Sequence, residues 1–233
     1  MDLDALIELD RQLLLLFNGS PSLYLDGLVD TLTTAVTWVP LYLALLYMVI
    51  KNNDSVAQIM LVVVCALLCV LLTGTIDDTI VKPTVARWRP THDPVIGSMV
   101  DVVNQYRGGS YGFFSAHAAN TFSLAIFFSL LVRSRLLTFF LVFWSLVNCW
   151  TRVYLGVHFP GDILCGLLWG GIGGALVYLL YYQLRRRLSK GISFVSSQYT
   201  STGYQACDID VVISVLVFTF IYALLRACFM LYM

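Results

Sequence analysis

Long apolar runs separated by short polar segments form the dominant pattern of this chain. Each run approaches the roughly 20 residues that an α-helix needs to cross a bilayer. The pattern predicts an all-α fold, a polytopic transmembrane helix bundle with about six spans whose ends are placed to within several residues. The predicted spans are residues 31–50, 57–79, 115–132, 136–155, 160–184 and 211–231.

The N-terminal region has a different pattern, because charged residues alternate there with leucine and isoleucine. Residues 2–17 form a run too short and too charged to span a membrane, and Asn18-Gly19-Ser20-Pro21 ends it. We expect an N-terminal amphipathic helix that lies in the membrane interface. The first residues are acidic, whereas a secretory signal begins with positive charge, so no cleavable signal peptide is predicted.

These patterns divide the chain into four parts. Residues 1–30 hold the interfacial helix and a lead-in, and residues 31–184 form the membrane core. Residues 185–210 form a basic and polar loop, and residues 211–233 form a C-terminal transmembrane helix. Small residues in the fifth predicted span are spaced to let a neighbouring helix approach closely. They are Gly166, Gly170, Gly171, Gly173 and Gly174.

Composition supports a membrane protein and argues against other classes. Hydrophobic residues make up 59% of the 233 residues and charged residues only 12%, whereas a soluble domain carries about 25% charge. The formal net charge is zero, so no nucleic-acid partner is indicated. The six cysteines include no C-x-x-C pair, which argues against a disulfide framework and against a zinc site.

The distribution of cations predicts the orientation of the bundle. The positive-inside rule places the more basic set of connections in the cytoplasm and the acidic N-terminus outside. The basic set holds Lys51, Arg133, Arg135, Arg185, Arg186, Arg187 and Lys190. The cations of the outer connections run against the rule, and phosphate binding would give a reason for them. These cations are Lys82, Arg87, Arg89, Arg107 and Arg152.

Polar residues suited to phosphate chemistry lie at the ends of the predicted spans, all on the outer face. Three separate clusters contribute cations, a hydroxyl, two imidazoles and a carboxylate. Arginine offers a planar fork to phosphate oxygens and lysine a point charge. Arg87 lies two residues before Arg89 and is left out of the core set. The core set is Lys82, Arg89, Ser115, His117, Arg152, His158 and Asp162.

Two of these clusters have specific chemical interpretations. Ser115 is a good N-cap for the apolar helix that follows, and the first N–H groups of that helix can donate to an anion. Asp162 can hydrogen-bond one nitrogen of His158, which would fix its tautomer and leave the other nitrogen free to attack. The alternative is purely structural: Ser115 only caps, His117 is an interfacial histidine, and Asp162 only begins a helix.

Three motifs in this sequence resemble the signatures of the type 2 phosphatidic acid phosphatase (PAP2) superfamily. The family motifs are K-x6-R-P, P-S-G-H and S-R-x5-H-x3-D. Their counterparts are Lys82-x6-Arg89-Pro90, Phe114-Ser115-Ala116-His117 and Thr151-Arg152-x5-His158-x3-Asp162. Phe114, Ala116 and Thr151 depart from the family pattern. These departures bear on substrate preference more than on mechanism.

The resemblance implies a mechanism that uses neither metal ion nor cofactor. His158, oriented by Asp162, would attack phosphorus and form a phosphohistidine. His117 would protonate the leaving oxygen and then activate water. The developing charge would be held by Lys82, Arg89, Arg152, Ser115 and the N–H groups near Ala116 and His117.

We therefore expect residues 31–184 to form the catalytic core of a phosphatase in a bacterial cytoplasmic membrane, with its site facing the exterior or periplasm. The substrate would be a lipid phosphate or diphosphate, such as undecaprenyl diphosphate, lipid A phosphate or phosphatidylglycerol phosphate. A phosphotransferase that passes phosphate to a second lipid is an alternative with the same intermediate. A transporter is a third reading, but charge within the spans is sparse, with Arg226 the clearest case.

Overall fold

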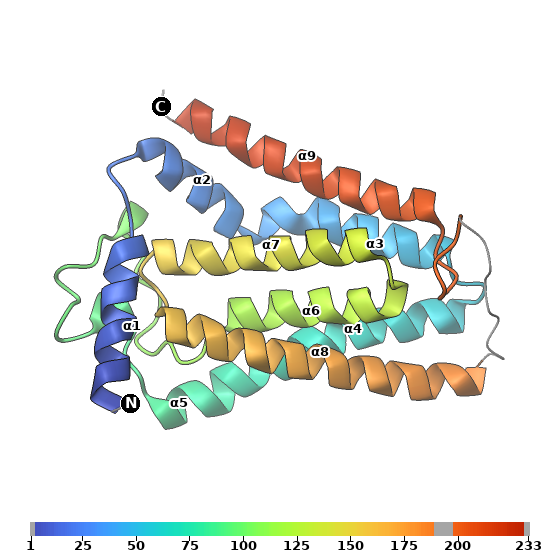
Figure 1. The fold of residues 1–233 in the computed structure, drawn as a ribbon, viewed down its shortest axis with the longest axis horizontal. Helices are drawn as coiled ribbons and strands as arrows, with labels where there is room; N and C mark the ends of the chain where they lie inside the picture. The colour runs from blue at the N-terminus through green and yellow to red at the C-terminus, as the bar shows by residue number, and fades with distance from the viewer. Residues whose placement is uncertain (1–2, 189–197, 231–233) are drawn as a thin grey trace.

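A computed structural model of the chain describes residues 3–188 and 198–230, most of which are helical (Figure 1). The fold class predicted from the sequence is confirmed, because the described residues form an α-helical bundle with isolated β-bridges only. The α-helices are α1 (Leu3–Phe17), α2 (Leu23–Thr33), α3 (Val39–Lys51), α4 (Val56–Ile76), α5 (Lys82–Val85), α6 (Ala116–Val132), α7 (Arg135–Tyr154), α8 (Pro160–Leu188) and α9 (Ala206–Met230). The short turns are η1 (Ala35–Trp38), η2 (Asp77–Val81), η3 (Pro90–His92) and η4 (Val103–Gln105).

The number of spans is close to the expected six. Within the described residues, four helices are long and apolar enough to cross a membrane: Val56–Val85, Arg135–Tyr154, Pro160–Arg187 and Ala206–Phe229. The pair formed by α2 and η1–α3 supplies a fifth span if the two parts are counted as one. Helix α6 has 17 residues, the lower limit of roughly 17 for a spanning helix, so the prediction of about six is approximate.

The span predicted at 31–50 is not one continuous helix. Helices α2 and η1–α3 meet at an angle of 65°. Side chains beyond the break satisfy carbonyl groups that the break releases: Thr37 Oγ1 donates to Thr31 O at 2.7 Å and Trp38 Nε1 donates to Leu32 O at 2.8 Å. Because unpaired backbone groups are costly in an apolar medium, these bonds allow the bend to persist within the bundle.

Helix α1 lies across one end of the bundle, roughly perpendicular to the other long helices (Figure 1). The guanidinium group of Arg11, in α1, lies 3.2 Å from the Asp93 carboxylate. Just after α1, Asn18 Nδ2 donates to Tyr154 O at 2.8 Å. A helix in this position is suited to the interfacial location that its amphipathic sequence predicts. The same end contains the end of α4, the start of α6, the end of α7 and the start of α8, and is called the site end below.

The interior of the bundle is apolar and rich in aromatic side chains. Trp38 makes edge-to-face contacts with Trp144 and Phe220, with ring centroids 5.8 and 5.4 Å apart. Many large apolar side chains face outward instead, among them Leu67 and Leu168. Outward apolar side chains on several helices fit a protein whose sides contact lipid.

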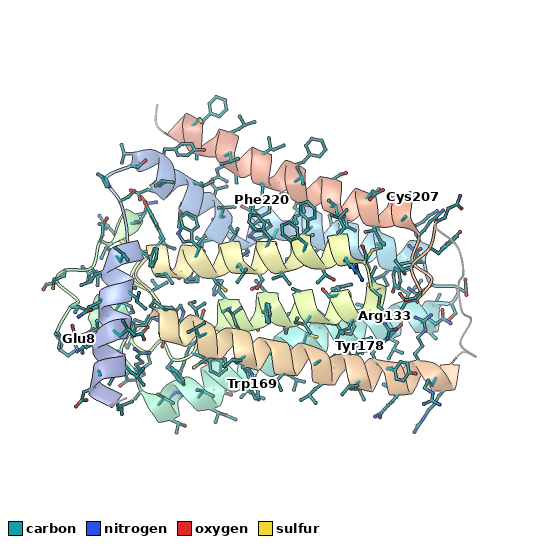
Figure 2. All side chains as sticks on the ribbon, in the orientation of Figure 1. Glu8, Arg133, Trp169, Tyr178, Cys207 and Phe220 are labelled. Carbon is teal, nitrogen blue, oxygen red and sulfur yellow. The ribbon has the colours of Figure 1, made fainter. Side chains whose placement is uncertain are left out.

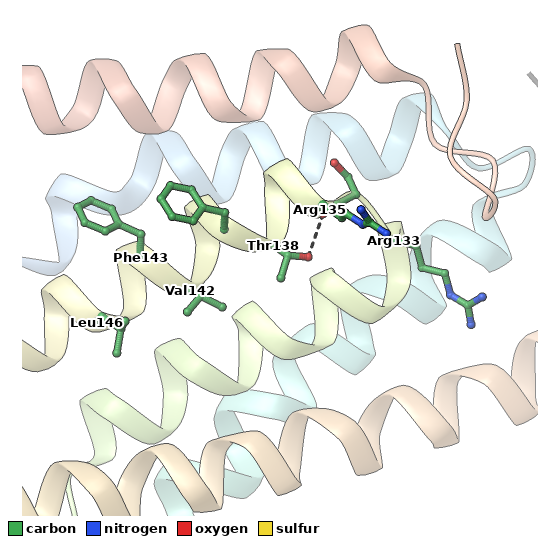
Figure 3. A pocket seen from close by; sticks show the side chains of 8 residues that line it. Arg133, Arg135, Thr138, Val142, Phe143 and Leu146 are labelled. Atoms are coloured by element: carbon green, nitrogen blue, oxygen red, sulfur yellow. Dashed lines mark hydrogen bonds between the residues drawn. The ribbon is translucent and has the colours of Figure 1, made fainter. Parts of the chain in front are cut away.

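The opposite end of the bundle carries the basic connections. The predicted cytoplasmic cations lie on the helix ends found there, and Figure 2 labels Arg133 at this end and Glu8 at the site end. Lys190 falls outside the described residues. A groove at this end follows the first half of α7, where Thr138, Val142 and Leu146 line it beside Arg133 (Figure 3). This groove is formed by α7 and the turn before it, and none of the residues that line it belongs to the three motifs.

Helices α6 and α8 approach each other closely along a row of glycines. A Cβ atom on Gly166 would lie 2.7 Å from the carbonyl oxygen of Ser115, and one on Gly170 would overlap the carbonyl oxygen of Ala119. The close helix packing predicted from the glycine-rich segment is therefore confirmed. Its effect is to place the start of α6, with Ser115, directly against the second turn of α8.

Replacement of Gly170 by alanine is expected to destabilise this contact. The added methyl would collide with backbone, which cannot move aside as a flexible side chain can. We expect a loss of about 1–3 kcal/mol, seen as a lower thermal unfolding midpoint in detergent. Gly171→Ala is the matched control, since its Cβ would meet only the Phe122 ring at 3.3 Å. Equal midpoints for both variants would show that α6 and α8 are not closely packed at Gly170.

Candidate active site

All three motifs meet at the site end of the bundle. Each of the polar residues predicted for the site lies at the end of a helix or in the loop beside it. Lys82 begins α5, Arg89 lies in the loop after it, Ser115 caps α6, Arg152 lies in the last turn of α7, His158 lies between α7 and α8, and Asp162 lies in the first turn of α8.

His158 is buried, with 2% of its surface exposed, and contacts Arg89 directly. Arg89 Nη1 lies 3.2 Å from His158 Nε2, and the same guanidinium donates to Val157 O and Tyr111 O, each at 3.1 Å. A guanidinium can only donate hydrogen bonds, so Nε2 must be the acceptor. The ring proton therefore lies on Nδ1, and the lone pair of Nε2 faces the cationic side of the site.

The electrostatic surroundings of His158 favour its neutral form. Burial lowers its pKa well below the usual value, and the positive charges of Arg89, Arg152 and Lys82 lower the pKa further. The first motif thus contributes two cations, Lys82 and Arg89, and the third motif contributes Arg152. All three act on the same imidazole. A neutral imidazole has a free lone pair, which a nucleophile or base requires.

Asp162 is fully buried and faces His158 without forming the predicted hydrogen bond in this structure. Asp162 Oδ2 lies 3.7 Å from His158 Nδ1, beyond hydrogen-bonding distance. The carboxylate instead accepts from Phe159 N at 3.0 Å and from Arg87 Nη1 at 2.7 Å. His158 Nδ1 is buried and has no hydrogen-bond partner among the described residues. A small rotation of either side chain would bring the two groups into contact.

Arg152 is held by residues from two other parts of the chain. Its Nη1 donates to Thr33 Oγ1 at 2.6 Å, and its Nη2 donates to Tyr106 OH at 3.2 Å. Its Nε is buried and has no partner among the described residues. Because a buried guanidinium group is costly without a full set of acceptors, Arg152 retains capacity to bind an anion.

Lys82 is paired with carboxylates from the preceding turn. Its Nζ lies 2.8 Å from Asp77 Oδ2 and also contacts Asp78. Asp77 is fully buried, and its other oxygen accepts from Phe114 N at 3.1 Å. This single carboxylate therefore ties the lysine of the first motif to the loop that carries the second motif.

The second motif opens α6 as the sequence predicts. The hydroxyl of Ser115 accepts from Ala118 N at 3.4 Å, and its backbone N–H donates to Asp162 O at 3.1 Å. Motifs two and three are thus joined directly. Ala116 and His117 occupy the first turn of α6, where backbone N–H groups lack helical partners. The His117 side chain is exposed, while Ser115 is fully buried.

Several residues that contact the site were absent from the prediction, among them Asp10, Thr33, Asp77, Asp78, Arg87 and Tyr106. For Arg87 the sequence did contain a usable signal, namely its position two residues before Arg89. Trp88 pairs with Tyr111 in a β-bridge, and in such extended backbone Arg87 and Arg89 point to the same side. Asp10, Asp77 and Tyr106 reach the site only through the fold. His92 is half-buried beside Thr91, and exposed Arg226 contacts Tyr222 OH at 3.4 Å.

Comparisons with known proteins show what this chain is similar to. A model of the PAP2 superfamily matches residues 58–186, more than half of the chain and all three motifs. A lipid A 4'-phosphatase of Bacteroides thetaiotaomicron is 41% identical over 191 residues, which cover 80% of this chain and 83% of that protein. A lipid A 4'-phosphatase of Porphyromonas gingivalis is 35% identical and covers 79% and 78%.

No solved structure matches this chain significantly. The spanning helices and the bacterial relatives together indicate a bacterial membrane protein. The extent of the family match and the identity to the two relatives are sufficient to assign the chain to a family. The chain belongs to the PAP2 superfamily and is a membrane lipid phosphatase.

Proposed function

We propose that this protein removes a phosphate monoester from lipid A through a phosphohistidine intermediate on His158. The observation that carries the proposal is the neutral, buried imidazole whose Nε2 lone pair faces Arg89 at 3.2 Å. A phosphate group bound to Arg89 and Arg152 would lie beside that lone pair. The relatives named lipid A 4'-phosphatase support the choice of lipid and of the 4' position.

The first chemical step transfers phosphate to the protein. Arg89 exchanges its bond to Nε2 for a phosphate oxygen, and Nε2 attacks phosphorus as the bond to the lipid oxygen breaks. The imidazole becomes cationic, and Asp162, 3.7 Å from Nδ1, stabilises it after a small approach. His117, exposed at the start of α6, supplies the proton to the leaving oxygen.

The second step returns the free enzyme. His117, now neutral, takes a proton from water as the water oxygen attacks phosphorus, and the bond to Nε2 breaks. Lys82, Arg89 and Arg152 hold the negative charge that develops in both steps. The Ser115 cap and the first N–H groups of α6 at Ala116 and His117 supply further donors to phosphate.

The proposed location follows from charge and from substrate. The basic connections lie at the end of the bundle opposite the motifs. The positive-inside rule places these basic connections in the cytoplasm, so the site would open to the periplasmic face of the inner membrane. The outward cations of the motifs are then explained by the phosphate that they bind.

A panel of lipids tests the proposal directly. Purified protein in detergent would be given bisphosphorylated lipid A, undecaprenyl diphosphate or phosphatidylglycerol phosphate, with free phosphate and product mass measured. We expect kcat/KM for lipid A to exceed the others by at least roughly tenfold, and tandem mass spectrometry to place the loss at the 4' position. A preference for either of the other lipids would contradict the proposed substrate.

The same panel separates hydrolysis from transfer. With labelled lipid A and an unlabelled lipid acceptor, hydrolysis places the label in free phosphate. Label that moved mainly to the acceptor would establish the phosphotransferase alternative, which shares the His158 intermediate.

A further inference from the structure

The N-terminal helix α1 contacts the candidate active site through one partly buried carboxylate, that of Asp10. Asp10 has 12% of its side chain exposed and uses both oxygens. Its Oδ1 accepts from Gly161 N at 2.7 Å, and its Oδ2 accepts from Arg87 Nη2 at 2.6 Å. Gly161 fits closely here, since a Cβ atom at that position would lie 2.7 Å from Asp10 Oδ2. Asp10 therefore contacts the first turn of α8, one residue before Asp162.

Arg87 bridges the two carboxylates. Its Nη2 binds Asp10 and its Nη1 binds Asp162 Oδ1 at 2.7 Å. The guanidinium also lies over the Phe159 ring, 4.3 Å from the centroid. A planar group held at two edges and one face has little freedom to rotate. The position of Asp162 is consequently set from α1 through Arg87.

The orientation of Asp162 matters because its two oxygens have different tasks. Oδ1 is engaged by Arg87, while Oδ2 binds Phe159 N and faces His158 Nδ1. With Arg87 bound to Oδ1 and Phe159 N bound to Oδ2, the carboxylate lies 3.7 Å from His158 Nδ1. An approach of a few tenths of an ångström would turn this gap into a hydrogen bond.

We propose that α1 is part of the active site, with Asp10 and Arg87 acting as positioning residues that hold Asp162 behind His158. The proposal rests on the proposed role of His158 as nucleophile. As positioning residues, Asp10 and Arg87 act on Asp162 and not on the phosphate itself. Their contribution falls on the step in which charge develops on the imidazole, not on the binding of the lipid.

The test is Asp10→Asn, which keeps the size of the side chain and its acceptor for Gly161 N but removes the charge that holds Arg87. We expect kcat to fall roughly tenfold with KM changed less than about twofold, because misplacement of a catalytic group slows chemistry more than binding. The matched control is Glu8→Gln on the same helix. Glu8 has 58% of its side chain exposed, and within the part of the chain that the structure describes it pairs only with its neighbours Arg11 and Gln12 on α1.

A double variant separates the relay from simple support of α8. Glutamine at Arg87 removes the bridge, so Asp10→Asn should have no further effect on kcat in the Arg87→Gln background. A full additional loss in that background would overturn the proposal, because Asp10 would then act only on the start of α8. An unchanged kcat in Asp10→Asn, or a loss matched by Glu8→Gln, would overturn it as well.

Failure of this proposal can be told apart from failure of the proposed function. If His158→Gln abolishes phosphate release while Asp10→Asn leaves kcat intact, the nucleophile stands and only the role of α1 is lost. If His158→Gln remains active, the nucleophile itself is wrong. Unfolding midpoints of all variants, measured in the same detergent, must lie close to that of the parent for kcat to be interpreted. A midpoint lowered only in Asp10→Asn would assign Asp10 a structural role instead.

Discussion

Replacing His158 with glutamine is expected to lower phosphate release by at least roughly 10³-fold, because removal of a nucleophile leaves only transition-state stabilisation by the surrounding donors. Glutamine retains an acceptor that can accept from Arg89, so the buried hydrogen bond at 3.2 Å has a substitute. The variant should therefore fold. The measurement is release of phosphate from a lipid substrate, with acid-quenched protein assayed for covalently bound phosphate.

His92→Gln is the matched control for this prediction. His92 lies in the loop between the first and second motifs, and among the described residues its side chain hydrogen-bonds only to its neighbour Thr91. We expect its activity to stay within about twofold of the parent, as is usual for a substitution outside the reacting groups. Bound phosphate in the parent and none in His158→Gln would support the intermediate. Retained turnover in His158→Gln would rule it out.

Arg89→Lys is expected to reduce kcat/KM by roughly 10²-fold, in the range found when one donor to a developing oxyanion is removed. Arg89 donates at once to Val157 O, Tyr111 O and His158 Nε2. Lysine keeps the charge but has no planar fork, so it cannot hold these groups and the phosphate in the same geometry. Burial and the charge of Arg152 lower the pKa of Arg89, as expected for cations gathered around one anion site.

Arg107→Lys provides the comparison for the arginine substitution. Arg107 lies in the same loop, and its side chain makes one hydrogen bond within the described residues, from Nη1 to the Thr91 carbonyl at 3.4 Å. We expect kcat/KM to change less than about twofold in this variant, because an exposed single contact contributes little. Equal losses in the two variants would mean that loop structure, and not the fork of Arg89, controls activity.

The sequence was sufficient for the fold class and for the residues that meet at one end of the bundle. Apolar runs near the spanning length predicted the helices. Because successive spans cross the membrane in opposite directions, the three motifs were predicted to lie at one end. The glycine-rich segment of α8 gave its close packing against α6. These features depend on local spacing, which a single sequence records directly.

Features that depend on tertiary contact could not be read in the same way. The break between α2 and η1–α3 is stabilised by Trp38 and Thr37, whose bonding partners precede the bend. Asp10 lies 151 residues from Gly161, and no sequence pattern links them. The hydrogen bond expected between Asp162 and His158 was predicted from spacing alone, whereas Arg87 decides where the carboxylate lies.

The placement of the chain ends has a practical consequence. Figure 1 shows the N-terminal helix and the end of α9 both at the site end of the bundle. A polypeptide whose ends share one side must traverse the bundle an even number of times, so the 17-residue α6 counts as a full traverse. A reporter fused to either terminus would therefore lie at the same end of the bundle as the three motifs. The short connection between α3 and α4 lies at the far end and is the attachment point most distant from them.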